Sequence, residues 1–191
     1  MNKRHDRLGL SKILALCFIA GTALGCVFAS SLDSTADSQL LSYLTGYFSL
    51  LKSGISNTPP LWATIWEILR WPLFSGLLGS TLLGLFTSPL LLMLRGLFLS
   101  FTVSVFIRFF GLSGLLFSFS ALGVPALCSV LSLFIISLDV ITYHRSKKAG
   151  IAIPKTILLH FAVVFLLLAT GTLLHRCLSP ILLKLCSNLL I

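Results

Sequence analysis

Charged side chains are scarce in this sequence. Only 10% of its 191 residues are charged, and five of these are acidic. A soluble globular domain carries about 25% charged residues, so the composition excludes a chain whose surface faces mainly water. Hydrophobic residues make up 57% of the chain and gather in long runs. Because runs of about 20 apolar residues are typical of transmembrane helices, we predict an all-α integral membrane protein.

Motifs for catalysis are also lacking. The sequence has no HExxH pair, no Walker loop, no GxGxxG and no paired intramembrane carboxylates. Membrane hydrolases need a nucleophile with a base, or a set of metal ligands, so we predict that the protein is not an enzyme and holds no cofactor or metal. There is no CxxC pair either. We expect the five cysteines to fill space in membrane helices (Cys17, Cys26, Cys128, Cys177 and Cys186).

Basic residues outnumber acidic ones and give a formal net charge of +9. An excess of this size in a soluble protein suggests nucleic acid. Here the basic residues are thinly spread, so we expect anionic membrane lipids as partners and no nucleic acid. Lys and Arg concentrate on the cytoplasmic side of membrane proteins. The basic N-terminus, residues 1–12, and the basic loop at 141–155 are therefore predicted to be cytoplasmic.

The number of crossings follows from parity. A first helix over 13–31 leaves the cytoplasm, so an odd number of crossings must precede the loop at 141–155. Three helices of about 20 residues fit the apolar stretch between 71 and 140. We predict a five-transmembrane-helix bundle with the N-terminus inside and the C-terminus outside. After the first helix, its crossings are expected at 71–94, 96–110, 115–140 and 156–174, with an interfacial tail over 175–191.

Two arginines interrupt the apolar run LLMLRGLFLSFTVSVFIRFFG, residues 91–111. An arginine at the bilayer centre costs about 2.5–3.5 kcal/mol on insertion scales. We therefore expect Arg95 in a cytoplasmic turn and Arg108 at the outer end of the third helix. A helix start at Ser88-Pro89, which would place Arg95 one or two turns inside and snorkelling back, is the alternative.

Small residues at helical spacing are the candidate packing positions of the bundle. Gly21 and Gly25 form a GxxxG pair in the first helix, and Gly96, Ser100 and Ser104 have similar spacing in the third. These rows favour a compact bundle or a partner surface. The first run also carries ALGC at residues 23–26, which resembles a lipoprotein cleavage box, so cleavage is an alternative to a retained helix.

The segment 32–70 is polar and is predicted to lie outside the membrane. An amphipathic helix over 36–52, too polar to span, is followed by LWATIWEILRW, which fits a helix at the lipid headgroups. A cap packed on the bundle is the alternative for both helices. The candidate partner surface is the apolar face of the first of them (Leu40, Leu44, Phe48 and Leu51).

Asp139 and His160 are a candidate polar pair. Both lie within about two turns of the cytoplasmic ends of the fourth and fifth predicted helices. Adjacent antiparallel helices could bring them together as a proton-sensitive pair of the kind that transporters use. Alternatively, Asp139 pairs with Arg145 or Lys155 at the interface and His160 bonds to a carbonyl.

The order of these features resembles the stage II sporulation protein M family over nearly the whole chain. The similarity lies in AGTALGCVFAS (20–30), LLSYLTGYFSLLKSG (40–54), SPLLLMLRGLFLSFTVSVFIRFFGLSGLLFSFS (88–120), Pro125 and LSPILLKL (178–185). One departure is that Pro125 stands in the wholly apolar GVPAL, where the family commonly has polar residues after the proline.

The resemblance implies a non-enzymatic scaffold in the bacterial cell membrane, at the septum between mother cell and forespore. Its implied partners are two cell-wall hydrolases, stage II sporulation proteins D and P, and its implied role is peptidoglycan remodelling for septal thinning and engulfment. A second copy of the chain is a further candidate partner. The alternative functions are a permease subunit of a transporter or exporter, and a lipid-binding or lipid-flipping protein.

Overall fold

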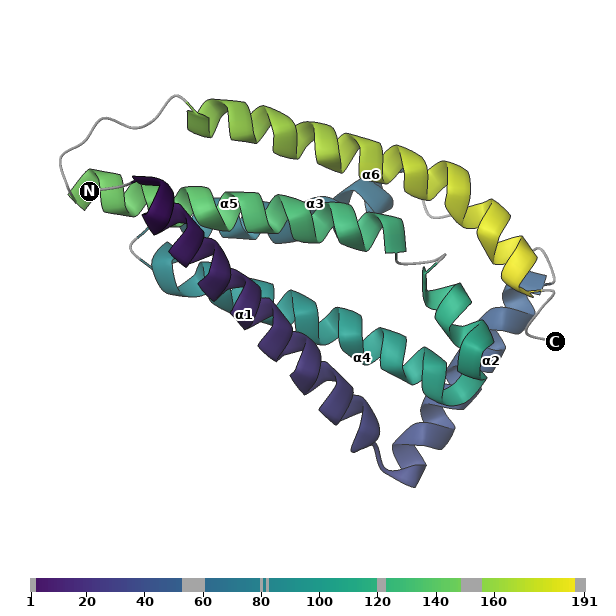
Figure 1. Ribbon diagram of the computed structural model, residues 1–191. Coiled ribbons are helices and arrows are strands. Elements are labelled where there is room, and N and C mark those ends of the chain that lie inside the picture. Colours follow the sequence, from purple (N-terminus) through teal and green to yellow (C-terminus); the bar gives the residue numbers. More distant parts are fainter. Residues whose placement is uncertain are drawn as a thin grey trace.

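The computed structural model describes residues 3–52, 61–79, 81, 83–119, 123–148 and 156–187, and within them the regular structure is helical throughout. Figure 1 shows the helices as long rods. They are α1 (Lys3–Ser30), α2 (Ser34–Lys52), α3 (Leu61–Gly79), α4 (Gly84–Ser118), α5 (Val124–Lys148) and α6 (Thr156–Ser187). The predicted all-α class is therefore confirmed.

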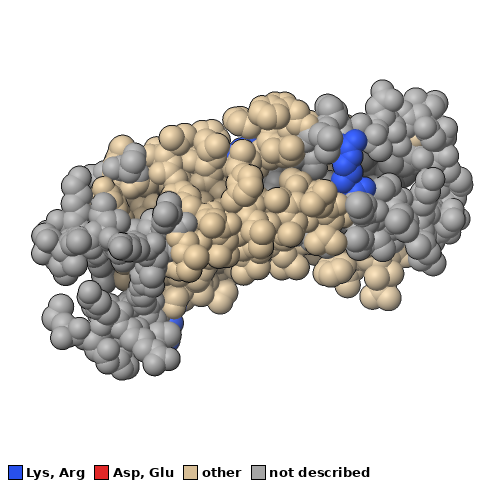
Figure 2. Space-filling view, turned by 90° about the horizontal axis from the view of Figure 1, so that it is seen from above, with Lys and Arg blue, Asp and Glu red and all other residues tan. Residues whose placement is uncertain are grey.

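Three helical segments of the described chain are long and apolar enough to cross a membrane: Gly9–Ser30, Gly84–Ser118 and Pro125–His144. A shorter apolar segment covers Leu159–Leu174. Large apolar side chains on the outside of the helices are widely exposed, as at Leu16 (67%) and Phe165 (74%). Among the described residues on the face seen in Figure 2, almost all are uncharged and a few are basic. These surfaces suit lipid and support membrane association.

The predicted turn at Arg95 is wrong. The helix α4 passes through Arg95 without interruption, and the chain turns earlier, between Gly79 and Gly84. The two glycines lie so close that a Cβ on Gly84 would stand 2.5 Å from the Cα of Gly79. The alternative start at Ser88-Pro89 is nearer to the structure, because α4 begins four residues before Ser88.

Other predicted boundaries also differ. The helix α3 is continuous over Leu61–Gly79, across Pro72, so the expected headgroup helix and the start of the expected 71–94 crossing are one element. The helix α6 likewise runs through the predicted boundary at 175 to Ser187. The chain does not turn at residue 71 or at residue 175. The two predicted helix ends rested only on the change in hydropathy at those positions.

A break does occur at Gly111, where the third helix was expected to end. Its backbone has φ 57° and ψ −135°, a conformation that side chains other than glycine rarely adopt. The rest of α4 folds back, since a Cβ on Gly114 would overlap the backbone carbonyl group of Phe106. The ring of Phe117 also packs on Phe106 at 5.2 Å between centroids. The next helix, α5, begins at Val124 and not at the predicted 115.

Two apolar clusters hold the described helices together. Leu14, Leu92 and Leu133 join α1, α4 and α5 in one cluster. The other joins α5 and α6, with Leu69 of α3 packed against it (Ile136, Val140, Val164 and Leu168). The most extensive pairing is between α1 and α4. Figure 1 shows α4 diverging from α3 and α5 towards the end of the molecule where α2 lies.

Candidate functional site

Gly21 and Gly25 of α1 lie in direct backbone contact with α4. A Cβ on Gly21 would stand 2.0 Å from the carbonyl oxygen of Met93, and a Cβ on Gly25 would stand 2.4 Å from that of Leu97. On the facing helix, a Cβ on Gly96 would stand 2.7 Å from the carbonyl oxygen of Phe18. No side chain fits at such distances. Only glycine allows the two helices to approach this closely.

The serines predicted as packing residues lie on the same contact. The hydroxyl of Ser100 is 2.9 Å from the sulfur of Cys26, and the hydroxyl of Ser104 donates to that sulfur at 3.5 Å. All five predicted packing residues therefore meet in one surface, which we call the α1–α4 seam (Gly21, Gly25, Gly96, Ser100 and Ser104). Residues further along α1 contact residues further along α4, so the two helices run parallel.

Arg108 lies where three helices meet. Its guanidinium donates to the carbonyl oxygen of Ala29 at 2.8 Å and to a carboxylate oxygen of Asp37 at 2.5 Å. It thereby connects α4 to the end of α1 and the start of α2. Sequence reasoning found no acid near Arg108, because Asp37 is 71 positions away. The expected place of Arg108, at the end of a helix, agrees with the nearby break at Gly111.

The partner surface predicted on α2 is only partly exposed. Leu40 and Leu44 are half-buried. The side chains of Phe48 and Leu51 lie outside the described part of the structure, although both residues belong to α2. Large exposed side chains on the described part of this helix include Tyr43 (75%) and Leu50 (53%). The surface that α2 offers is therefore broader than the predicted stripe.

Asp139 and His160 meet between α5 and α6. The imidazole Nδ1 lies 2.8 Å and 3.0 Å from the two carboxylate oxygens, in the position to donate to them. Asp139 is buried and His160 is half-buried. The structure therefore brings together the two residues that the sequence singled out. The side chains of Arg145 and Lys155, the other expected partners of Asp139, lie outside the described part of the structure.

A second contact sets the register of this helix pair. A Cβ on Gly171 of α6 would stand 2.8 Å from the Cβ of Cys128 of α5. The two contacts are eleven residues apart on each helix and run in opposite order, so α5 and α6 are antiparallel. Cys128 and Gly171 meet three turns from the Asp139–His160 pair. That spacing fits two straight helices side by side.

At the same end of α5, His144 binds the end of α3. Its Nε2–H donates to the carbonyl of Gly79 at 2.9 Å. That carbonyl belongs to the last turn of α3, which has no partner within its own helix. Gly79 also lies against Val140, whose Cγ2 would be 2.3 Å from an added Cβ. Sequence reasoning missed this capping contact, because nothing local links positions 79 and 144.

Serine hydroxyls form part of the buried interior. Ser129, Ser132 and Ser137 of α5 are fully buried, as are Ser75 of α3 and Ser88 of α4. Within the described residues, none of these five hydroxyl oxygens has a hydrogen-bond partner. Buried hydroxyls normally have one. Polar groups of this kind would suit water or a polar solute inside the bundle.

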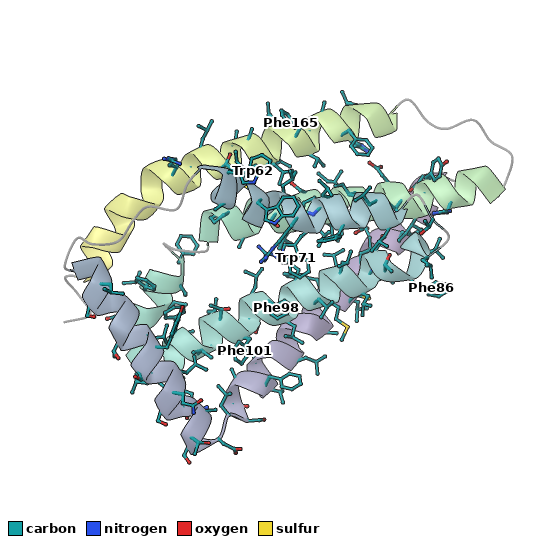
Figure 3. All side chains as sticks on the ribbon, turned by 180° about the vertical axis from the view of Figure 1, so that it is seen from behind. Trp62, Trp71, Phe86, Phe98, Phe101 and Phe165 are labelled. Carbon is teal, nitrogen blue, oxygen red and sulfur yellow. The ribbon has the colours of Figure 1, made fainter. Side chains whose placement is uncertain are left out.

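Arg95 lies against an aromatic ring inside the bundle. Its guanidinium carbon is 5.7 Å from the centroid of the Trp71 ring, and that of Arg70 is also 5.7 Å from it. The ring of Phe98 packs on Trp71 at 6.0 Å. Figure 3 shows Trp71 and Phe98 between α3 and α4. We call these four residues the Arg95 cluster. The insertion cost of an arginine led the sequence interpretation to a turn, and the structure meets that cost with an aromatic contact instead.

The described ranges contain no group of three or more His, Cys, Asp or Glu residues that could hold a metal ion. Comparison with family models, with curated proteins and with solved structures finds no match to the chain. The function must therefore be inferred from the residues and their geometry.

Proposed function

We propose that the protein is a non-enzymatic membrane scaffold for peptidoglycan remodelling during sporulation. In this proposal, it recruits the cell-wall hydrolases, stage II sporulation proteins D and P, to the septum for septal thinning and engulfment. The resemblance quoted above supports the family. The observation that supports a scaffold is the bond of Arg108 to Asp37 and Ala29, which holds α2 at the ends of α1 and α4.

The proposed topology has five crossings, by α1, α3, α4, α5 and α6, with α2 outside. The parallel α1–α4 seam and the antiparallel α5–α6 pair agree with this alternation. The shortest crossing, α3, is 19 residues, or about 28 Å, close to the thickness of the hydrocarbon core. The basic N-terminus is then cytoplasmic and the C-terminus is outside, as the distribution of Lys and Arg favours.

A scaffold needs a rigid outer surface, and α2 fits this requirement. An ion pair with a bidentate-capable arginine fixes its first turns, while Tyr43 and Leu50 remain exposed beyond them. Exposed apolar and aromatic side chains on a held helix are typical of protein contact surfaces. Partner binding would then require little reordering of the chain.

The test is to place charge on this surface. Leu44→Asp and Phe48→Asp together are expected to release both hydrolases from the septum and from co-purification, because a carboxylate in an apolar contact must be desolvated. Ser42→Asp and Ser49→Asp together are the matched control, since they add the same charge on the same helix at exposed positions. Normal recruitment by the double variant, with normal expression and helical content, would exclude α2 as the partner surface.

The Asp139–His160 contact favours a second candidate, a permease subunit of a transporter. A histidine and a buried carboxylate in contact inside membrane helices are the parts of a proton relay. The buried serines of α5 would add polar groups along a path. Flux of protons or solute into vesicles that contain the purified chain would support this function. Equal recruitment of hydrolases by Asp139→Asn and by the unchanged protein would leave the scaffold as the better account.

A further inference from the structure

Three of the buried serines lie on three different helices. Ser75 of α3 is 1% exposed, and Ser88 of α4 and Ser137 of α5 are both 0% exposed. Within the described residues, none of their hydroxyl oxygens has a hydrogen-bond partner. A buried hydroxyl without a partner lowers the stability of the fold, so buried hydroxyls normally have one. The level of these serines along their helices indicates what that partner is.

Ser75 and Ser88 stand opposite each other beside the turn between α3 and α4. At this turn Gly79 and Gly84 are in backbone contact, since a Cβ on Gly84 would be 2.5 Å from the Cα of Gly79. Ser75 precedes Gly79 by four residues, and Ser88 follows Gly84 by four. Residues four apart share a face of a helix. Because α3 and α4 are antiparallel, both serines lie one turn away from this contact, on the same side of it.

Ser137 lies at the same level on α5. Leu92 of α4 and Leu133 of α5 belong to one apolar cluster. Ser88 precedes Leu92 by four residues, and Ser137 follows Leu133 by four. Figure 1 shows that α4 and α5 run in opposite directions. Ser88 and Ser137 therefore lie one turn from the Leu92–Leu133 contact, again on the same side of it.

The contact between α3 and α5 gives the same level independently. Gly79 lies against Val140, whose Cγ2 would be 2.3 Å from an added Cβ. Ser75 precedes Gly79 by four residues, and Ser137 precedes Val140 by three. Since both helices run opposite to α4, α3 and α5 are parallel, and the two serines lie about one turn before this contact. Three separate contacts therefore place the three serines at one level, where α3, α4 and α5 meet.

We infer that Ser75, Ser88 and Ser137 together bind an ordered water molecule, and we call these residues the serine site. Their hydroxyls do not bond to one another, and water bridges polar groups that lie beyond direct hydrogen-bond distance. A buried water typically makes about three hydrogen bonds, one for each hydroxyl of the site. The set contains no carboxylate, which Ca²⁺ and Mg²⁺ sites normally include.

The bound water would connect three helices through hydrogen bonds that the serines do not make directly. All the contacts that define the site lie between α3, α4 and α5. The inference therefore depends neither on the hydrolases nor on the number of membrane crossings. Its tests can fail without affecting the proposed function, and the recruitment assay can fail without affecting the serine site.

The sign of a serine-to-alanine substitution separates a bonded hydroxyl from an unpaired one. The full chain is unfolded reversibly in mixed micelles with dodecyl sulfate and followed by helical circular dichroism. Ser88→Ala is expected to lower the folding equilibrium constant about fivefold relative to Ser42→Ala, because a hydrogen bond to the water is lost. Ser42→Ala at an exposed position of α2 measures the helix-propensity effect. A higher constant in Ser88→Ala would overturn the site, since removing an unpaired buried hydroxyl is stabilising.

Coupling between substitutions tests whether the serines share one ligand. When Ser88→Ala and Ser137→Ala are combined, the loss should be smaller than the product of the two single losses, because the first substitution already weakens binding of the same water. Ser129→Ala is the matched control. Ser129 is also 0% exposed on α5, and it lies eight residues, or about 12 Å, from Ser137. Its effect should be independent of Ser88→Ala, and equal coupling at Ser129 and Ser137 would exclude a shared ligand.

Radiolytic footprinting of the unchanged protein detects the water itself and requires no variant to fold. X-rays produce hydroxyl radicals from bound water, and these oxidise the side chains beside it. Leu92 and Leu133 are both 0% exposed and lie one turn from Ser88 and Ser137. Both leucines should be oxidised in the unchanged protein, and this oxidation should be lost when the two serines are replaced by alanine. Exposed Leu16 should be oxidised equally in both proteins.

Two outcomes of these measurements would overturn the water as ligand. Leu92 and Leu133 that stay unoxidised while Leu16 reacts would show that the site is dry. Sodium or potassium chloride that stabilises the unchanged protein, but not the variant with alanine at Ser88 and Ser137, would identify a cation in place of the water.

Discussion

Substituting the α1–α4 seam is the sharpest test of the packing. In Gly21→Ala, the new Cβ would begin 2.0 Å from the carbonyl oxygen of Met93 and would need about 3.4 Å for ordinary contact. The two backbones must therefore separate by about 1.4 Å at this point. The atom in the way is main chain and cannot rotate aside. Overpacking of this kind costs about 1–3 kcal/mol of unfolding free energy.

A glycine-to-alanine substitution outside the α1–α4 seam should have the opposite effect on the free energy of unfolding. An alanine at Gly76 of α3 meets nothing within 4 Å. Alanine is favoured over glycine in a helix by about 1 kcal/mol, so Gly76→Ala should be neutral or stabilising. Comparing Gly21→Ala with Gly76→Ala removes the propensity effect from the result. The two variants should differ by the overpacking cost alone, about 1–3 kcal/mol.

The measurement is reversible unfolding of the purified protein in mixed micelles, with increasing dodecyl sulfate, followed by helical circular dichroism. Gly25→Ala should behave like Gly21→Ala, because its Cβ would also meet main chain. The contact between Cys26 and Ser100 offers a local readout, since separation of the helices should expose the thiol to maleimide. Equal stability of the Gly21 and Gly76 variants would refute the seam.

Two further substitutions test other contacts by the same unfolding assay. Asp139→Leu should cost about 1–3 kcal/mol, because His160 loses its acceptor between α5 and α6, while Asp139→Asn keeps an oxygen and should cost less; equal losses would show that the hydrogen bond is unimportant. Gly111→Ala should also destabilise by about 1–3 kcal/mol, although no atom lies within 4 Å of its Cβ, since the backbone there has φ 57°. A neutral Gly111→Ala would show that α4 does not keep this break.

Local features of the sequence predicted the parts of the fold that depend on composition and on spacing along one helix. Apolar runs predicted helices, because a chain with 57% hydrophobic residues cannot satisfy its backbone in lipid otherwise. The small residues of α1 and α4 were identifiable for the same reason, since four-residue spacing puts them on one face. Asp139 and His160 could be paired in advance because a short loop makes their helices antiparallel neighbours.

The turn that was wrongly predicted at Arg95 shows what local features could not predict. Charge cost pointed to a turn at the arginine, yet the chain turns at Gly79 and Gly84, where two backbones come into contact. The cost of Arg95 depends on what covers it, and the cover is Trp71 on a different helix. No local pattern records that pairing.

The sequence by itself therefore determined the class of this protein: an all-helical chain with helices long and apolar enough to cross a membrane, small-residue faces and a few isolated charges. Tertiary structure decided what each charge does. Arg108 meets Asp37 and holds α2, whereas Arg95 shares an aromatic ring with Arg70 inside the bundle. The physical reason is that hydropathy and helical period act over a few turns of one helix, while the energy of a buried charge depends on partners that only folding brings near.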